Sequence, residues 1–274
     1  MRGTVGLTLA LGGGILFALC GRLTASDPRP VRAAVMDRVV VAAPIQLMLT
    51  GGDRFLAADM EAIRSAAIGP DNPNEMLYRI RSHQVAAQLN PCHEDNYYLA
   101  NALLTWGGAL DEGDDILKRA MECRVWDEYP PLFYGFNHHF FYKDDAVASR
   151  AFEIAAERSV HNRVVLKRVA IMIKAGQYKD DHMALDYLKH ERDQAKDPQL
   201  KLALDKRVGR LEGLIALREA QQRFEAQFKR PLKSPQELLD HHILDGFPND
   251  PVGLGYEFDN GTFKLRQMKI GGMG

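Results

Sequence analysis

"YKDDAVASRAF", residues 142–152, recurs as "YKDDHMALDYL", residues 178–188, an offset of 36 positions. A degenerate copy, "EGDDILKRAM", begins at Glu112. In each copy a turn leads into two aspartates and then into apolar residues at i, i+1, i+4 and i+5, a spacing that places them on one face of a helix. The sequence therefore predicts a repeated helical unit.

A second helical segment is expected before each turn, over residues 95–106, 131–141 and 163–174. Helix, short turn and helix, recurring in the mid-thirties of residues, resembles the tetratricopeptide (TPR) repeat family over roughly residues 51–190. The turn "AGQYKDD" resembles that family's inter-helix turn, and "LNP" at residues 89–91 resembles its repeat junction. The copies are spaced by 30 and then 36 residues, so the array is TPR-like, and the resemblance implies an α-solenoid.

The paired aspartates that begin at Asp114, Asp144 and Asp180 admit two interpretations. As carboxylates they are candidate metal ligands. At the start of the second helix of each unit, they would instead cap free N–H groups and face the positive end of the helix dipole. Turns of stacked repeats lie too far apart to share a metal ion, so capping is favoured.

The last part of the chain predicts a long helix and then a β-hairpin. Asp197 is the expected N-cap, Pro198 occupies the first turn, and the helix runs to about Lys229. Asn260-Gly261 lies between "GYEFD" and "TFKLRQ" and readily supplies the two positive-φ residues of a type I′ turn. The expected buried stripe of the long helix comprises Leu204, Val208, Leu211, Leu214, Ile215, Leu217, Phe224 and Phe228.

About 40 C-terminal residues resemble the C-terminal segment of the major pseudopilins of type II secretion and related pilins. The matching residues are Arg230, Pro231, Ser234, Leu238, Ile243, Pro248, Asp250, Pro251, Gly253 and Tyr256. The resemblance implies a pre-ordered turn that delivers the chain into the hairpin, and it makes Pro248, Asp250, Pro251, Gly253 and Tyr256 candidates for a docking element or a cap. The cap is favoured, because the open end of a solenoid needs covering.

The N-terminus departs from the pilin pattern. "MRGTVGLTLALGGG" lacks the F-T-L-x-E type of helix and its cleavage motif, so assembly as a pilin is not expected. The whole chain is similar to bacterial membrane-anchored TPR proteins that end in such a segment, and this resemblance implies no enzymatic activity.

Residues 3–20 carry no charge and are bracketed by Arg2 and Arg22. Such a stretch is just long enough to cross a hydrocarbon core of about 30 Å as a helix. An uncleaved signal anchor is the favoured interpretation, a cleaved signal peptide is the second, and a lipoprotein attached at Cys20 is the third. A soluble core helix is disfavoured by the glycines at 12–14.

The orientation of that span rests on opposing signals. Arg22, Arg29, Arg32 and Arg38 follow the span, so the positive-inside tendency places the body in the cytoplasm. The cysteines and the pseudopilin-like segment favour the outside. We expect a bacterial inner-membrane protein with a single N-terminal span and a periplasmic body.

Cys92 and Cys123 form a candidate disulfide. Cys92 precedes the first helix of one unit and Cys123 ends its second helix, and these two ends lie together in an antiparallel helix pair. Such a bond persists only outside the reducing cytosol. Two unpaired thiols remain the alternative.

The first helices of TPR units line a concave surface, which is a candidate groove for an extended peptide or a partner helix. Here they carry Tyr97, Asn101, Tyr134, Asn137 and His138. For any single tyrosine, packing in the core is the stronger expectation.

Composition and motifs narrow the function further. The net charge of −1 lacks the basic excess of nucleic-acid-binding proteins. No nucleotide-binding or hydrolase motif is present, and the adjacent pairs His138-His139 and His241-His242 lack the i, i+4 spacing of a helical metal site. We therefore expect no enzyme activity, no cofactor, no metal and no nucleic-acid partner.

Together these features predict a mainly α protein: an N-terminal membrane helix, a TPR-like α-solenoid, and a small C-terminal helix with a β-hairpin cap. The expected divisions are 1–24 for the anchor, 25–50 for a linker, 51–196 for the repeats, and 197–274 for the long helix with its cap. We expect a scaffold or adaptor for envelope proteins, with pilus or secretion components as the specific hypothesis. The alternatives are a metal-dependent enzyme using residues 240–245 and a cytoplasm-facing adaptor.

Overall fold

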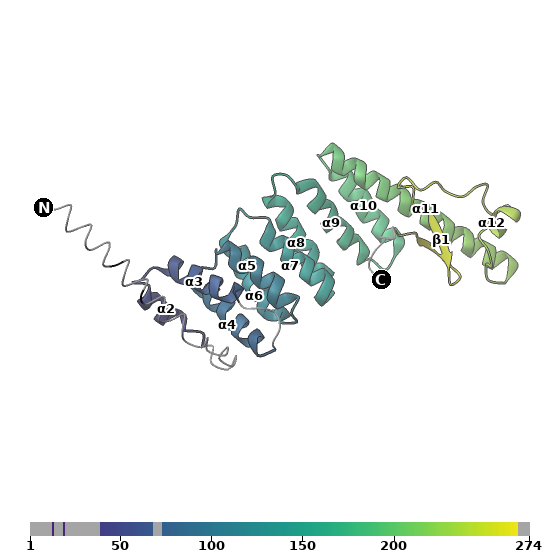
Figure 1. Ribbon diagram of the computed structural model, residues 1–274. Coiled ribbons are helices and arrows are strands. Elements are labelled where there is room, and N and C mark those ends of the chain that lie inside the picture. The colour runs from purple at the N-terminus through teal and green to yellow at the C-terminus, as the bar shows by residue number, and fades with distance from the viewer. Residues whose placement is uncertain (1–12, 14–18, 20–38, 68–72, 268–274) are drawn as a thin grey trace.

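The computed structural model describes residues 13, 19, 39–67 and 73–267. The protein is mainly helical and ends in a two-stranded antiparallel sheet. Figure 1 shows an elongated body in which the helices follow one another from α3 at one end to α11 at the other. The helices are α2 Ala43–Leu49, α3 Arg54–Ala66, α4 Pro73–Leu89, α5 Glu94–Ala100, α6 Leu110–Cys123, α7 Tyr129–Asn137, α8 Asp145–Arg158, α9 Arg163–Gly176, α10 Asp181–Gln194, α11 Pro198–Phe228 and α12 Glu237–Asp240.

The main packing contacts join helices that are consecutive in the chain or separated by one other helix. Helices α3 and α4, α7 and α8, α8 and α9, and α10 and α11 make the most extensive contacts. The predicted anchor at residues 3–20 and the lipidation candidate Cys20 lie outside the described residues. None of the helices in the described part of the chain combines the length and apolar character needed to cross a membrane.

Aspartate caps start several of these helices. Asp144 accepts a hydrogen bond from the backbone N–H of Val147, and Asp180 accepts bonds from the N–H groups of His182 and Met183. Capping by the second and third aspartate pairs is therefore confirmed.

The prediction for the first pair is wrong. Helix α6 begins at Leu110, so Asp114 and Asp115 lie inside it rather than at its start. The neighbouring Gly113 allows a close approach of two helical segments: a Cβ there would lie 2.3 Å from Oγ1 of Thr105. This glycine serves helix packing, and the turn precedes it.

The first helices of two successive units end in π-helical turns. Helix α5 continues into η2, Asn101–Thr105, and α7 continues into η3, His138–Tyr142. Lys143 follows η3 with φ 57°, a left-handed conformation that ends the helix before Asp144 begins the next one. A π-turn adds a residue to the turn and therefore rotates the side chains after it.

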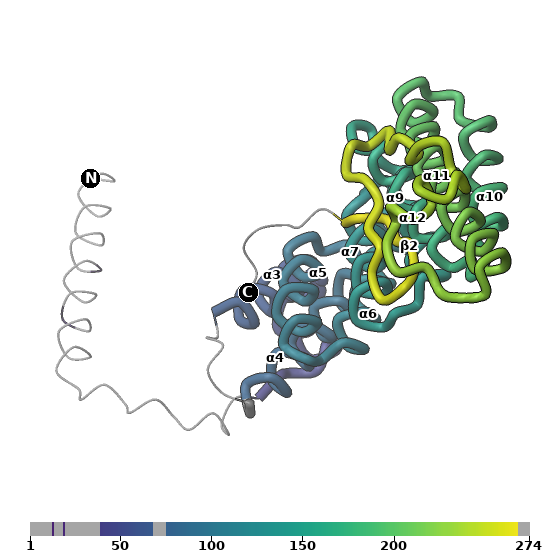
Figure 2. The backbone as a smooth tube through the Cα atoms, turned by 90° about the vertical axis from the view of Figure 1, so that its right-hand side faces the viewer, coloured from purple at the N-terminus to yellow at the C-terminus, as the bar shows by residue number. Residues whose placement is uncertain are grey.

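The largest core cluster surrounds α11. Leu204, Leu217 and Phe224 are fully buried there, and Leu238 and Phe263 from the C-terminal segment join them. The predicted stripe of α11 is confirmed, with Phe228 only partly buried at its end. Figure 2 shows the yellow C-terminal segment lying along this green helix.

The predicted hairpin is confirmed. Strand β1, Tyr256–Asp259, pairs antiparallel with β2, Thr262–Leu265, and Asp259 faces Thr262 across the turn. Asn260 has φ 51° and Gly261 has φ 75°. Two successive positive-φ residues are what a type I′ turn requires, so the Asn-Gly pair determines the register.

Helix α3 buries small residues and exposes large ones. Of Phe55, Ala58, Ala62 and Ile63, only the two alanines are buried. Phe55 is 54% exposed and Ile63 is 68% exposed. The inner face of α3 consists of small residues and Glu61, so the large apolar residues point away from the body.

Candidate functional site

An exposed aromatic cluster lies where η2 and η3 meet solvent. Trp106, Phe136 and Phe140 are each at least 40% exposed. The ring of Trp106 stacks at 6.3 Å from the rings of both phenylalanines and meets Phe141 edge-on at 5.3 Å. We call Trp106, Phe136, Phe140 and Phe141 the aromatic edge. Exposed, contiguous apolar area of this kind marks interaction surfaces on soluble proteins.

The aromatic edge was not among the groove residues predicted from the sequence. A related pattern is present: Trp106 of this edge and the nearby Tyr142 stand 36 positions apart, and both lie at the end of the first helix of a unit. Large aromatic residues at two equivalent helix ends are unusual in a turn, where polar residues are the norm.

A stack of rings runs along α7 and η3 beside this edge. His138 lies between Tyr134, at 4.4 Å, and Tyr142, at 4.8 Å between ring centroids. From α6, Asp114 places Oδ2 at 3.3 Å from Nε2 of His138, and Asp111 accepts a 2.8 Å hydrogen bond from the hydroxyl of Tyr142. These contacts join the second helix of one unit to the first helix of the next.

Burial dominates the electrostatics of this stack. It raises the pKa of Asp114, and the nearby His138 opposes the rise only in part. Burial also raises the pKa of Tyr134 and of Tyr142, and the hydrogen bond to Asp111 raises that of Tyr142 further. Both tyrosines are therefore neutral donors at physiological pH, and neither is prepared to act as a base.

The five residues predicted to line a groove do not all do so. Asn137 is 1% exposed and donates a 2.9 Å hydrogen bond to Oδ1 of Asn101. Tyr97 is also 1% exposed and lies in the core, where its hydroxyl donates to Asp127 at 2.8 Å. The prediction is corrected for Tyr97 and Asn137: because both side chains are buried, they pack inside the body and do not line a groove. Asn101, Tyr134 and His138 keep partial exposure.

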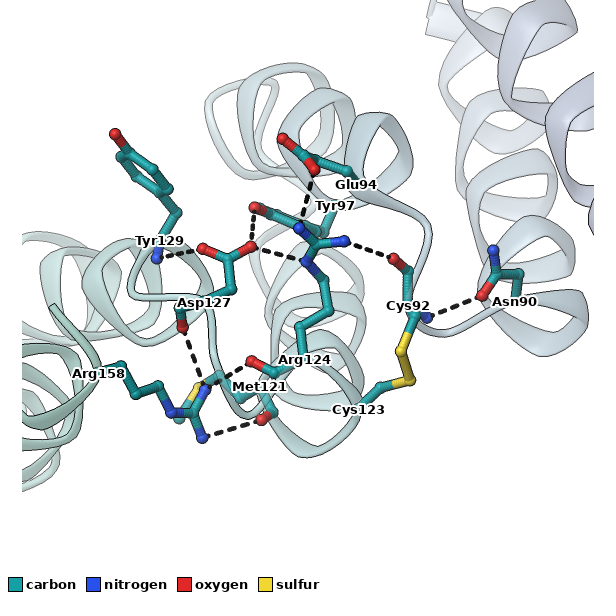
Figure 3. A network of polar contacts seen from close by, with 10 residues as sticks. All are labelled: Asn90, Cys92, Glu94, Tyr97, Met121, Cys123, Arg124, Asp127, Tyr129 and Arg158. Carbon is teal, nitrogen blue, oxygen red and sulfur yellow. Dashed lines mark hydrogen bonds and ion pairs between the residues drawn. A yellow bond between two sulfur atoms is a disulfide. The ribbon is translucent and has the colours of Figure 1, made fainter. Parts of the chain in front are cut away.

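Cys92 and Cys123 are joined by a disulfide with a Cα–Cα distance of 5.3 Å. Figure 3 shows the bond beside a polar network centred on Arg124. The guanidinium of Arg124 donates to Asp127 at 2.7 Å, to Glu94 at 2.8 Å and to the carbonyl of Cys92 at 3.1 Å. The disulfide and Arg124 thus hold the start of α5 against the end of α6 twice over.

The same corner is tied to the next unit by Arg158, the last residue of α8. Its guanidinium donates to the carbonyl oxygens of Met121, Arg124 and Asp127 (Figure 3). These carbonyls lie in or just after the last turn of α6, where intrahelical partners are missing. A cation at this position also suits the negative end of the helix dipole.

The pseudopilin-like segment packs on α11. Asp250 accepts hydrogen bonds from the backbone N–H groups of Val252, Leu254 and Gly255, and pairs with Arg210 of α11 at 3.1 Å. Burial alone would raise the pKa of Asp250, but these bonds and the charge of Arg210 together hold it below its ordinary value. Both side chains of this pair are almost fully buried.

Glycines of α11 make room for that segment. A Cβ on Gly213 would lie 2.0 Å from the hydroxyl oxygen of Tyr256 and 3.2 Å from Cβ of Pro248. A Cβ on Gly209 would meet Pro251 at 3.0 Å. Gly253 has φ 78°, which the turn requires. The five candidate cap residues therefore form one turn and strand start that lies against α11.

The His/Asp-rich segment 240–245 does not gather ligands. His241 packs its ring 4.5 Å from that of Phe228, and His242 adopts φ 52°. Across residues 39–67 and 73–267, no three His, Cys, Asp or Glu side chains lie close enough together to hold a metal ion.

Comparison with known proteins returned no match: no family model, no curated protein and no solved structure is similar to this chain. The geometry of the chain itself therefore carries the functional argument.

Proposed function

We propose that this protein is a non-catalytic scaffold or adaptor that binds protein partners in the bacterial envelope. Residues 3–20 tether it to the inner membrane, and its body lies in the periplasm. Residues 51–196 form a TPR-like α-solenoid, and residues 197–274 close its end. A pilus or type II secretion-like assembly is the proposed setting.

The aromatic edge is the observation that carries the proposal. Trp106, Phe136 and Phe140 expose large rings side by side although they stand in ordered helical turns. Tryptophan and other aromatic residues are enriched at the energetic centres of protein interfaces.

The repeat geometry supports the solenoid. Asn101 and Asn137, on the first helices of successive units, bond to each other, and the main helix contacts join near neighbours along the chain. The pairing of Cys92 with Cys123 supports a compartment outside the cytosol. The close packing of residues 248–256 on α11 supports a cap, so partner binding is assigned to the aromatic edge.

In-cell photo-crosslinking tests the proposal. Benzoylphenylalanine placed at Phe140 should yield a discrete adduct in native membranes, and Trp106→Ala with Phe136→Ala should abolish it. The matched control carries the crosslinker at Val160, which is 82% exposed in the turn between α8 and α9. Pilin-like or secretion components in the adduct would identify the pathway. Equal, diffuse crosslinking from Phe140 and Val160 would overturn the scaffold proposal.

Truncation after Lys229 is a poorer test. Leu232, Leu238 and Phe263 belong to the core around α11, so removing them would open that core. Partners lost on truncation could then report unfolding rather than docking.

A further inference from the structure

Helix α3 is amphipathic with its faces reversed. The residues buried against the body are Ala57, Ala58, Glu61, Ala62 and Ser65, which are small or polar. Phe55, Leu56, Met60 and Ile63 on the other side are 48–68% exposed. A helix of a soluble domain turns its large apolar residues inward, so this outer face is built to contact something other than water.

Helix α2, which packs against α3 and α4, also exposes large apolar residues. Residues 39–49 carry no charge, and Ile45, Met48 and Leu49 are 47–77% exposed. We call Ile45, Met48, Leu49, Phe55, Leu56, Met60 and Ile63 the outer apolar face. It lies at the first end of the helical array, whereas the last end is covered by the C-terminal segment (Figure 1). Ends of such arrays need a polar cap or a cover.

Buried polar bonds fix this orientation. Glu61 of α3 is fully buried and accepts hydrogen bonds from Gln46 of α2, at 2.7 Å, and from Ser82 of α4. Rotating α3 to bury Met60 would pull this carboxylate away from Gln46 and Ser82 and leave it only Arg64 of the same helix, which donates to it at 2.9 Å. The outer apolar face is therefore held outward.

Charged residues of α3 accompany this face. Arg54 lies at the start of α3, over the ring of Phe55 at 4.8 Å, whereas Arg64 near its end donates to the buried Glu61 at 2.9 Å. Asp59, whose side chain is 60% exposed, lies between Phe55 and Ile63 on the outer side and contacts His93 at 2.9 Å. An arginine beside an exposed apolar face suits a surface with phosphate headgroups above hydrocarbon.

The length of the segment before α2 indicates which surface the outer apolar face contacts. The uncharged stretch ends at Cys20, and residues 21–38 separate it from Val39. Eighteen extended residues reach at most about 60–65 Å, and a flexible chain of that length averages about 25 Å. A tether this short keeps α2 and α3 close to the bilayer that would hold residues 3–20.

We propose that the outer apolar face of α2 and α3 lies in the headgroup–acyl boundary of that bilayer. The inference rests on the membrane tether of the proposed function. It adds that the body is held against the membrane by its first end, with α11 and the hairpin directed away from that contact. The occupant is lipid, and a second copy of the chain is the competing outcome of the test.

The test uses the full chain in vesicles of phosphatidylcholine and phosphatidylglycerol, with and without bromine on the acyl chains. The two native tryptophans, Trp106 and Trp126, are replaced by Phe. Single tryptophans are then placed by Phe17→Trp in the predicted span, Met60→Trp in the outer apolar face, and Val160→Trp as the exposed control. The readouts are quenching of fluorescence by bromine and the emission wavelength.

A face buried about 5–10 Å below the headgroups should bring Met60→Trp within reach of bromine, and we expect its emission to fall about twofold while Val160→Trp is unchanged. Quenching at Phe17→Trp without quenching at Met60→Trp would overturn this inference and leave the tether intact. Blue-shifted but unquenched emission from Met60→Trp would also overturn it, in favour of a second copy. Absence of quenching at Phe17→Trp would overturn the tether itself.

Discussion

Asn137 donates its side-chain hydrogen bond to Asn101, which stands 36 positions earlier in the chain. That separation equals the offset between the two "YKDD" copies. The first helices of two successive units therefore meet side chain to side chain. The bond is a direct, testable consequence of the repeat.

The bond should contribute measurably to stability. Asn137→Ala removes a buried donor and should lower the free energy of unfolding by about 1–2 kcal/mol. Asn101→Ala should cost at least as much, because it leaves the side-chain amide of Asn137, which is 1% exposed, without its acceptor. Urea denaturation of both single variants and the double variant measures the coupling.

The double variant should lose less than the sum of the single losses, by at least about 0.5 kcal/mol. Asn162→Ala, which removes an exposed hydrogen bond to Glu128, is the matched control and should change stability by less than about 0.5 kcal/mol. Strict additivity of Asn101→Ala and Asn137→Ala would show that the bond is not formed in solution.

The disulfide should stabilise the body strongly. Cys92 and Cys123 are 31 residues apart, and closing a loop of this size contributes about 3–4 kcal/mol in the chain-entropy model. Cys92→Ser with Cys123→Ser should lower the unfolding free energy by that order, whereas Cys20→Ser should leave it unchanged. Intact mass before and after reduction would contradict the bond if the two masses were equal.

Substitution by alanine should lower the stability of the protein at one glycine and leave it unchanged or raise it at another. Gly213→Ala forces a methyl group against Tyr256 and should destabilise the protein by about 1–3 kcal/mol. Gly176→Ala, at the end of α9, meets no atom within 4 Å and should be neutral or stabilising by up to about 1 kcal/mol. Thermal or urea denaturation compares them, and equal effects would mean that the C-terminal segment does not pack on α11 as described.

A buried carboxyl group, Asp250, and a partly buried one, Asp114, should give opposite pH dependence of stability. The pKa of Asp250 is lower in the folded state than in the unfolded state, where it is near 3.9. The ionised Asp250 side chain therefore stabilises the fold above pH of about 3.9, and this stabilisation is lost as the pH falls through the folded-state pKa. Asp250→Asn should therefore cost about 3–5 kcal/mol at neutral pH and much less in acid. The measurement is unfolding free energy between pH 7 and pH 3.

Asp114 serves as the counterpart in the same experiment. Its folded-state pKa is raised by burial, so its ionisation opposes folding as pH rises through the unfolded pKa toward the folded one. The cost of Asp114→Asn relative to the native chain should thus shrink, or become a gain, on going from acid to neutral pH. The same direction of change in Asp250→Asn and Asp114→Asn would refute one of the two assignments, and the direction would show which.

The parts of the fold that local patterns determine were predictable. The stripe of α11 follows from apolar spacing alone, and the Asn260-Gly261 turn follows from the φ angles that its residues accept. The caps at Asp144 and Asp180 follow from side-chain chemistry next to a turn. Each of these signals acts within a few residues.

The features that the sequence did not predict depend on contacts between residues far apart in the chain. Gly113 looked like part of a turn because only the structure reveals Thr105 against it. The outward side of α3 depends on Glu61 finding Gln46 and Ser82, which no periodicity encodes. The aromatic edge depends on π-turns that rotate the helix ends, a deviation that apolar spacing does not reveal.

The hydrogen bonds of Arg158 should affect how the body unfolds. In an array whose parts touch mainly their neighbours, the strength of each junction decides whether melting is one event or a sequence of events. Arg158 couples α8 to the end of α6, which the disulfide already crosslinks to the start of α5. The middle of the body should thus unfold as one cooperative block, and fraying should begin at α2 and α3, whose proposed membrane cover is missing in aqueous solution.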